Sequence, residues 1–497
     1  MMDGGPPGAQ TEAAVEAACR AVGGTELSWC RAVPGGTGTT VLALLLSRPA
    51  PLLLPSLVSC LRSLLRSHPL LRSLLSLSSP TPAFSVPSPD PPATPQLPPF
   101  LLLLPSPISP SADSFHSVLE LELNLNPWSS PAPSDPLPVF FAALHPLPHG
   151  DGDGHRSVLA LKFHTAACDR TSAVAILTEL MRLMAAEGRT AEEAEEEEGG
   201  GGGGGASGED DAGCELGIED RIPKRDAWKP FWARGKDLIG YSLNGLRTST
   251  LRFEDAASNR CSQVVRFVMD APETRSLLRA CRAKGVKLCG AIAAAALIAA
   301  HSSKQLENGC YETYSVVTLI DCRKYLEPVL DKHNVGFYHS AITNAHSIHG
   351  GEGLWEVAIR CHNSYSNAMS NKKHLTDIGD LNFLMCKAIE NPQLTPSSSL
   401  RTAIISVFEE PVVYETSDLQ KALGVEDYVG CASVHGVGPS IAVFDTIRDE
   451  QLDCACVYPA PLHSRKQIER VVEHMKRILI EGSSHLDDHE DFVENND

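Results

Sequence analysis

The stretch from residue 157 to residue 170 constrains the fold of this chain more than any other. Its first half alternates apolar and polar residues as far as His164, which is the period of a half-buried strand. Asp169 follows five residues later across a run of small residues, and an apolar, helix-like run occupies residues 171–184. A histidine at the end of a strand is held by the sheet while its ring faces open space. His164 is therefore a candidate general base on a rigid support, and Asp169 is a candidate carboxylate for orienting this segment.

Chain length and one abrupt change in composition predict how the chain is divided. A chain of 497 residues is too long for one ordinary core, so we expect two domains or a pseudo-duplicated pair of subdomains. Glutamates followed by glycines between positions 192 and 205 cannot bury anything and indicate a flexible linker. The predicted division is a flexible N-terminus at 1–24, an N-terminal subdomain at 25–186, an acidic and glycine-rich linker at 187–216, a C-terminal subdomain at 217–480 and an acidic tail at 481–497.

Charge and cysteine content exclude several classes of protein. The net charge of −19 argues against nucleic-acid binding, because contacts with phosphates require a basic face. The 15 cysteines form no framework, and Cys454 and Cys456 have no second Cys/His pair close by, so we expect reduced thiols and no metal site. Residues 1–20 carry no signal pattern, and the apolar runs are far shorter than a membrane span. We expect a soluble protein of a reducing compartment, most simply the cytoplasm.

Local periodicity predicts the elements around this stretch. In the first half we expect strands at 37–46, 118–125 and 137–147, a short strand near Phe84, an amphipathic helix at 53–65 and an extended Pro/Ser-rich loop at 79–110. In the second half we expect strands at 262–269, 314–320, 402–408, 440–445 and 452–458, helices at 271–284, 289–300, 354–369 and 464–480, and a loop at 374–396.

Strand, histidine, short gap, aspartate and helix together resemble a known signature. It is the HHxxxDG or HxxxDG motif of the chloramphenicol-acetyltransferase-like superfamily, which includes plant BAHD acyltransferases, alcohol acetyltransferases and peptide-synthetase condensation domains. This sequence departs from the motif at three points. Phe163 stands where condensation domains carry their first histidine, the gap from His164 to Asp169 is one residue longer than usual, and Arg170 replaces the glycine.

Three further segments extend the resemblance over most of the chain. His68 and Pro69 end a helix with an HPxLR-like turn, and Gly285 separates a helix from an alanine-rich helix, as in members of the superfamily. The most specific match is Asp321-Cys322-Arg323 followed by Asn334-Val335-Gly336-Phe337, which resembles the DxRxxL…GN/GF segment of alcohol acetyltransferases and condensation domains. The DFGWG pentapeptide of BAHD enzymes is absent from the chain.

The resemblance implies an α/β (α+β) fold of two chloramphenicol-acetyltransferase-like subdomains, with mixed sheets flanked by helices and a flexible crossover between them. It implies an acyltransferase in which His164, in a tunnel at the subdomain interface, removes the proton of a small alcohol or amine as that acceptor attacks an acyl-CoA thioester. Asp169 would pair with Arg323 to support the site. Asn334, Tyr338 and Ser340 are candidate oxyanion or substrate contacts. Acyl-CoA would be a co-substrate of a monomer, with no permanently bound cofactor.

Other interpretations of the same residues stay open. The chain could be a catalytically degenerate member of the fold that binds a ligand or a protein; His164 would then be buried, whereas an enzyme requires its ring to face a tunnel. Cys168 lies close enough to His164 in sequence to be a thiol nucleophile, although packing under the helix fits it better. Ser433 and His435 lack the Gly-x-Ser-x-Gly elbow of hydrolases and fit a turn better. His68, beside a helix-ending proline, fits a structural role.

Overall fold

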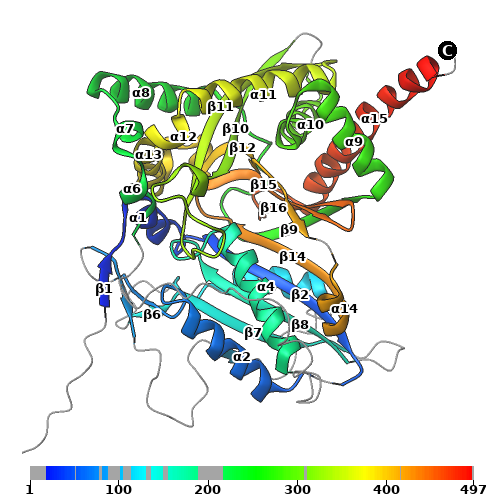
Figure 1. The fold of residues 1–497 in the computed structure, drawn as a ribbon. Coiled ribbons are helices and arrows are strands. Elements are labelled where there is room, and N and C mark those ends of the chain that lie inside the picture. The colour runs from blue at the N-terminus through cyan, green and yellow to red at the C-terminus, as the bar shows by residue number, and fades with distance from the viewer. Residues whose placement is uncertain are drawn as a thin grey trace, which may run out of the picture.

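A computed structural model describes residues 18–50, 52–77, 81–87, 101–103, 114–129, 136–148, 155–187, 216–306, 310–414 and 416–494. Two lobes, each built on its own large sheet, lie one above the other (Figure 1). This mixed α/β arrangement confirms the predicted fold class. The predicted linker falls almost entirely outside the described residues, as do most of the Pro/Ser-rich loop, residues 1–17 and the last three residues of the tail.

The lower lobe in Figure 1 carries a five-stranded sheet in the order β14-β2-β8-β7-β5. The strands are β14 (Val425–Val434), β2 (Thr37–Arg48), β8 (His155–His164), β7 (Phe140–Pro146) and β5 (Leu101–Leu103). Helices α2 (Leu54–Ser67) and α4 (Arg170–Glu187) pack against each other beside this sheet, and α1 (Gly24–Ala32) leads into β2. A second small sheet has the order β1-β4-β3-β6, with β1 at Ala18–Ala21, β4 at Ala83–Val86, β3 at Leu74–Ser76 and β6 at Leu137–Pro138.

The upper lobe carries a seven-stranded mixed sheet. Its main path is β11-β10-β12-β15-β16-β9, and β13 pairs with β15 beside that path. The strands are β11 (His339–His349), β10 (Tyr311–Asp321), β12 (Arg401–Phe408), β15 (Gly438–Arg448), β16 (Gln451–Ala460), β9 (Cys261–Met269) and β13 (Val412–Tyr414). Four helices share a large apolar core with this sheet: α9 (Ala271–Lys284), α10 (Leu288–Ser302), α11 (Leu354–Ser370) and α15 (Arg465–Glu494). Further helices complete the upper lobe: α6 (Ile218–Arg221), α7 (Lys224–Ala227), α8 (Phe231–Arg247), α12 (Lys373–Thr376) and α13 (Ile378–Glu390). Helix α14 (Asp418–Leu423) packs against α4 of the lower lobe.

Local sequence signals explain the helices that were predicted correctly. Helix α9 begins with a capping box between Asp270 and Glu273 and ends at Gly285, which adopts a left-handed φ of 63°. Helix α10 follows at once, and its alanines are buried on almost every side. Small side chains allow a helix to be enclosed on all sides, so the alanine-rich run reports close packing rather than chemistry.

Several predictions of local structure were wrong. Residues 118–125 form part of helix α3 (Phe115–Asn124), not a strand. Leu119 and Leu123 are buried at helical spacing, and Glu122 beside them is buried because Lys162 Nζ lies 2.8 Å from its Oε2 atom. The sequence pattern suggested a strand because Glu122 was counted as an exposed polar residue, whereas its pairing with Lys162 allows it to be buried. The loop predicted at 374–396 contains α12 and α13, and the last helix continues from the predicted end at Ile480 to Glu494.

The division between the two halves of the chain is not continuous along the sequence. Strand β14 belongs to the predicted C-terminal subdomain, yet it pairs with β2 of the other lobe over Val425 to Val434 (Figure 1). The sheet of the first lobe therefore includes a strand from the second half of the chain. At the other boundary, β1 and the start of α1 lie within the N-terminus that was predicted to be flexible.

Candidate active site

His164 is the last residue of β8, and the loop that follows it contacts the upper lobe through Asp169. It pairs across the sheet with Thr39 of β2, and its backbone N–H donates to Val139 O at 2.8 Å. The alternation of β8 turns apolar side chains into the lobe core, while its last residue passes directly into the loop toward α4. The side chain is completely buried, with an exposed fraction of 0%. The sequence-predicted histidine is thus held by a rigid strand, but its ring does not face solvent.

The environment of the His164 ring defines its protonation state. Trp128 lies edge-on at 5.0 Å between ring centroids, and the Ala166 N–H donates to Nδ1 at 3.2 Å. Burial lowers the pKa of His164 to about 3, so the imidazole is neutral at pH 7. Because Nδ1 accepts a hydrogen bond, the neutral ring carries its proton on Nε2. The Nε2 atom is buried and has no hydrogen-bond partner among the described residues.

Asp169 is equally buried, but all of its polar atoms are engaged. Arg323 contacts both carboxylate oxygens of Asp169, with Nη1 2.9 Å from Oδ2 and Nη2 3.1 Å from Oδ1. The backbone N–H groups of Ser172 and Tyr338 donate to Oδ1 at 2.8 Å and to Oδ2 at 2.9 Å. The Asp169 N–H in turn donates to Gly336 O at 3.0 Å. The predicted pair of Asp169 and Arg323 is present, and it joins the loop after His164 to the upper lobe.

A second histidine, which sequence reasoning missed, also contacts this carboxylate. His339 Nδ1 lies 3.0 Å from Asp169 Oδ2, although the two groups are not aligned as a hydrogen bond. Burial by itself raises the pKa of Asp169, but the charge of Arg323 and then that of His339 hold this pKa well below its usual range. Only the position of His339, two residues after the Gly-Phe of the matching segment, could have indicated this contact.

The guanidinium of Arg323 also contacts several other groups. Its Nη1 lies 3.1 Å from Asp321 Oδ1, and its Nη2 donates to Ser172 Oγ at 2.8 Å and to Asn334 O at 3.2 Å. The Tyr338 ring lies 5.0 Å from the guanidinium. These contacts keep the pKa of Arg323 above its usual value, although burial acts against them. The Asp-x-Arg segment is therefore a structural clamp around Asp169.

The three candidate oxyanion contacts have different surroundings. Asn334 Oδ1 accepts the Asp331 N–H at 2.8 Å, which uses the side chain to close its own loop. Tyr338 packs in an apolar cluster with Ile320 and Leu326 of the upper lobe. Ser340 is buried, and its Oγ has no hydrogen-bond partner among the described residues. Of the three, Ser340 has a hydroxyl available for a ligand.

The alternative nucleophiles lack the required chemistry. Burial raises the pKa of the Cys168 thiol well above its ordinary value, and Asp169 beside it adds to this shift. Ser433 Oγ accepts the Thr39 N–H at 3.0 Å, and His435 Nδ1 lies 3.0 Å from Ser262 Oγ, so these two side chains are separately engaged in loop contacts. His68 Nε2 lies 2.7 Å from Glu179 Oε2 and joins α2 to α4.

Arg170, which stands where the motif has glycine, forms a further contact between the lobes. Its Nη1 lies 3.2 Å from Asp445 Oδ1, and its guanidinium carbon lies 4.1 Å from the centre of the Phe408 ring. Burial is the main reason why the pKa of Asp445 is raised, and Arg170 partly offsets it. A side chain at this position therefore reaches β12 and β15, which a glycine cannot do.

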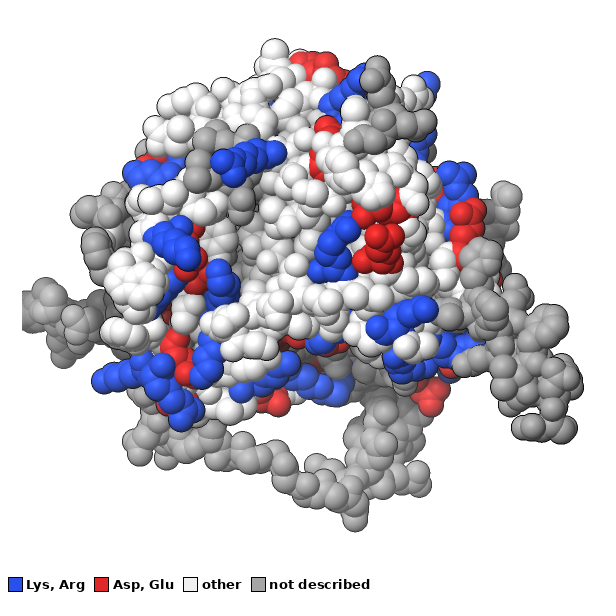
Figure 2. Space-filling model, turned by 90° about the horizontal axis from the view of Figure 1, so that it is seen from above, with Lys and Arg blue, Asp and Glu red and all other residues white. Residues whose placement is uncertain are grey.

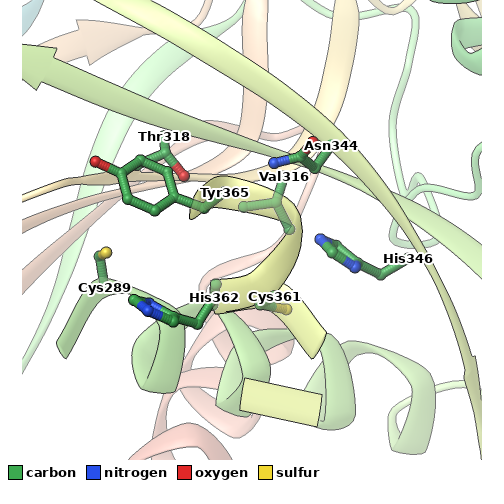
Figure 3. Close-up of a pocket in the computed structure, with 10 residues that line it drawn as sticks. Cys289, Val316, Thr318, Asn344, His346, Cys361, His362 and Tyr365 are labelled. Carbon is green, nitrogen blue, oxygen red and sulfur yellow. The ribbon is translucent and has the colours of Figure 1, made fainter. Parts of the chain in front are cut away.

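A small cavity elsewhere in the upper lobe is unrelated to this site. It lies between α10, α11 and the sheet and is lined by side chains that include Cys289, Thr318, Asn344, His346 and His362 (Figure 3). None of its lining residues contacts His164 or Asp169. Across the described parts of the chain, no group of three or more His, Cys, Asp or Glu side chains is arranged to hold a metal ion.

Comparisons with known proteins give the fold a class. No protein-family model and no curated protein sequence matches this chain. Among solved structures, a trichothecene 15-O-acetyltransferase from Fusarium sporotrichioides matches with a TM-score of 0.66 and 12% identity, over 93% of this chain and 94% of the other. Polyketide synthase associated protein 5 from Mycobacterium tuberculosis matches with a TM-score of 0.60 and 14% identity, over 94% and 98% of the two chains.

A third solved structure comes from another branch of the same fold. The first condensation domain of a calcium-dependent antibiotic synthetase matches with a TM-score of 0.59 and 15% identity, over 95% of this chain and 97% of the other. The chain therefore has the two-lobed fold of chloramphenicol-acetyltransferase-like acyltransferases and condensation domains. In the described part of the chain, no single helix is long and apolar enough to cross a membrane; only the bent pair of α9 and α10 passes by length and composition.

Proposed function

We propose that this protein is an acyltransferase that moves an acyl group from an acyl-CoA thioester to a small alcohol or amine. In this proposal His164 is the general base that removes the proton of the acceptor. One observation carries the proposal: the buried Nε2 atom of His164 has no hydrogen-bond partner in the part of the chain that the structure describes. A buried polar atom without a hydrogen bond costs about 1–3 kcal/mol, and a ligand group that binds Nε2 would remove this cost. Neighbours of the same fold include an acetyltransferase and condensation domains.

The reaction requires His164 to change its hydrogen bonding. The acceptor oxygen or nitrogen forms a bond to the thioester carbonyl carbon, the carbon–sulfur bond breaks, and the acceptor proton passes through the imidazole to the leaving thiolate. In the described state Nδ1 accepts from Ala166, so Nε2 already carries a proton. To act as a base at Nε2, the ring must carry its proton on Nδ1 instead, which requires release of the Ala166 contact. Acceptor binding, which brings polar groups to Nε2, would drive both changes.

Asp169 and Arg323 act as positioning residues in this proposal. The contacts of the His164 ring are with Ala166 and Trp128, whereas Asp169 and Arg323 hold the backbone that follows His164. A rigid loop limits the positions that the imidazole can take, and misplacement of a catalytic group by about 1 Å costs roughly 10²-fold in rate. We also propose that Ser340, whose hydroxyl has no hydrogen-bond partner in the described ranges, hydrogen-bonds the substrate.

A second candidate function rests on a different observation. His164 has an exposed fraction of 0%, and Phe163 beside it is also fully buried. A catalytically degenerate relative that binds a ligand without transforming it would have the same closed site. General-base catalysis favours a pKa near the operating pH, and the buried ring with a pKa of about 3 lies far below it. Ligand binding without turnover is therefore the alternative that the experiment must separate.

The experiment is thiol release from a panel of acyl-CoA donors with pooled alcohol and amine acceptors. The wild type is compared with His164→Ala and, as a matched control, with His68→Gln, a histidine that joins two helices away from the site. We expect acceptor-dependent release that falls about 10²–10⁴-fold in His164→Ala and is unchanged in His68→Gln. Release that survives His164→Ala contradicts the proposed role. Absence of release from the wild type, with coenzyme A bound in calorimetry, supports the ligand-binding relative instead.

A further inference from the structure

We propose that α8, together with Trp228 just before it, is an interfacial element that attaches the upper lobe to the surface of an anionic phospholipid bilayer without crossing it. The exposed apolar side chains here are Trp228, Trp232 and Ile239, which we call the α8 face. Their exposed fractions are 74%, 72% and 63%. None of the three contacts His164 or Asp169, so this proposal is independent of acyl transfer.

Two apolar side chains of this helix point outward, while a polar network lies on its inner side. A surface helix normally buries its apolar stripe and exposes its polar side. In α8, Trp232 and Ile239 are exposed together with Arg234 and Lys236. The inward contacts include polar ones: Lys229 Nζ, just before the helix, lies 2.8 Å from Asp237 Oδ2 and 2.7 Å from Asp377 Oδ1. Tyr241 Oη donates to Asp377 Oδ2 at 2.5 Å. Trp232 and Ile239, seven residues apart and therefore on one side of a helix, face away from these contacts.

A buried polar network therefore holds the helix in this orientation. Lys229 Nζ also lies 2.8 Å from Asp380 Oδ2 of α13, and both Asp377 and Asp380 are buried. Hydrogen bonding to the three aspartates raises the pKa of Lys229 despite the opposing effect of burial. The network fixes the inward side by directional contacts, so the outward placement of the α8 face is specified rather than incidental.

The segment around the α8 face has a net positive charge, although the exposed Glu327 Oε1 lies 3.2 Å from Arg225 Nη2. Residues 224–247 contain six Lys or Arg and two Asp, a net charge of +4 in a chain whose total is −19. Both aspartates are paired: Asp237 with Lys229, and Asp226 with Lys372. The cations Arg225 and Arg234 have side chains 76% and 53% exposed, and Lys224, Lys236 and Arg247 are exposed as well. Figure 2, which looks onto the upper lobe, shows basic side chains scattered over it beside acidic and uncharged ones.

This pattern fits a bilayer better than a folded partner. Helix α8 lies at the periphery of the upper lobe (Figure 1). Among the described residues, nothing lies within 4 Å of the place where a side chain would begin at Gly235 and Gly240, which leaves open space beside the helix. Tryptophan sits at the boundary between headgroups and acyl chains, and nearby Lys and Arg are attracted to anionic headgroups. An anionic lipid surface is complementary to both features.

The test is sedimentation of the full-length protein with vesicles of phosphatidylcholine alone or mixed with phosphatidylserine. Variants are Trp232→Ser with Ile239→Ser, and Arg225→Gln with Lys236→Gln. The control is Val329→Ser with Val413→Ser, which changes two apolar residues exposed at 70% and 66% away from α8. We expect binding to the mixed vesicles only, weakened about tenfold or more by either α8 variant and by high salt, and unchanged in the control.

Several outcomes would overturn the proposal. They are no binding to mixed vesicles, equal binding to neutral vesicles, or equal loss in the control variant. Light scattering after size exclusion adds an independent reading: a dimer that the α8 variants abolish would assign the α8 face to a second copy of the chain instead. The substitutions alter exposed side chains, and circular dichroism of each variant verifies that it remains folded.

Discussion

His164 and Asp169 lie five residues apart, and both are buried. They differ in how far their polar atoms are satisfied by hydrogen bonds. Every polar atom of Asp169 is engaged by Arg323 or by backbone N–H groups. His164 has one nitrogen that accepts a hydrogen bond at 3.2 Å and one nitrogen without a partner among the described residues. The satisfied group stabilises the loop, and the unsatisfied group is the one left available for a ligand. In this site, the group proposed to react is the one whose hydrogen-bonding capacity the fold does not satisfy.

The largest expected effect tests the satisfied side of this comparison. Asp169→Asn removes the charge that compensates buried Arg323, and breaking one partner of a buried pair costs about 3–5 kcal/mol. Urea denaturation should therefore show a large fall in the free energy of unfolding. Glu426→Gln is the matched control, since it breaks the exposed pair with Arg156 and should cost less than about 1 kcal/mol. Equal effects of the two substitutions would contradict the role of Asp169 as a clamp.

The next prediction tests the unsatisfied side. His164→Phe keeps a ring against Trp128 but removes the unpartnered nitrogen. We expect acyl transfer to be lost while the free energy of unfolding changes by no more than about 1–2 kcal/mol, in either direction, because no strong hydrogen bond is broken. Parallel activity and denaturation measurements provide the test. A loss of stability as large as that of Asp169→Asn would show that His164 is also a structural group.

The pH dependence of stability sharpens the same contrast, because the two residues titrate in different windows. The pKa of His164 is about 3 in the folded state, against an ordinary value of 6.5. The unfolded chain thus binds the proton first, and the His164 contribution to stability declines as the pH falls from about 6.5 toward 3. The depressed pKa of Asp169 makes its contribution decline only below about pH 4, the value for an unfolded aspartate.

A comparison of wild type with His164→Phe isolates the first window. Other buried histidines, among them His346 and His435, also have pKa values lowered by burial, but they are common to both proteins. The difference in unfolding free energy should therefore grow in favour of the variant as the pH falls from about 6.5 to 4. A difference independent of pH would show that His164 is not desolvated in solution.

The smallest expected effect concerns the wall of the site. Trp128→Phe keeps an aromatic edge against His164 but removes the hydrogen bond from Nε1 to Pro138 O at 2.9 Å. We expect a loss of about 1 kcal/mol in stability, which is typical of one buried hydrogen bond. Thermal denaturation measures this change. Trp355→Phe, which removes a similar bond to Gly482 O in the upper lobe, is a matched control and should cost about as much.

Much of the fold could be predicted because periodicity reports local burial. The strand ending at His164, the helix after Asp169 and the helix that begins at Ala271 are all where the pattern indicates. The pairing of Asp169 with Arg323 could be anticipated only through the resemblance of the Asp-x-Arg segment, since the two residues are 154 positions apart. Where a polar residue is buried by a distant partner, as Glu122 is by Lys162, the same pattern was misleading.

The sequence by itself determined most of the elements, the fold class and the identities of His164, Asp169 and Arg323. Only the tertiary structure decided that 118–125 is helical, that β14 completes the sheet of the other lobe, that His339 contacts Asp169, and that Trp232 and Ile239 of α8 are exposed. It also decided that Asp169 is satisfied while His164 is not. The physical reason is that helical and strand periods depend on neighbours a few residues away, whereas burial and hydrogen-bond satisfaction depend on segments brought together from far apart in the chain.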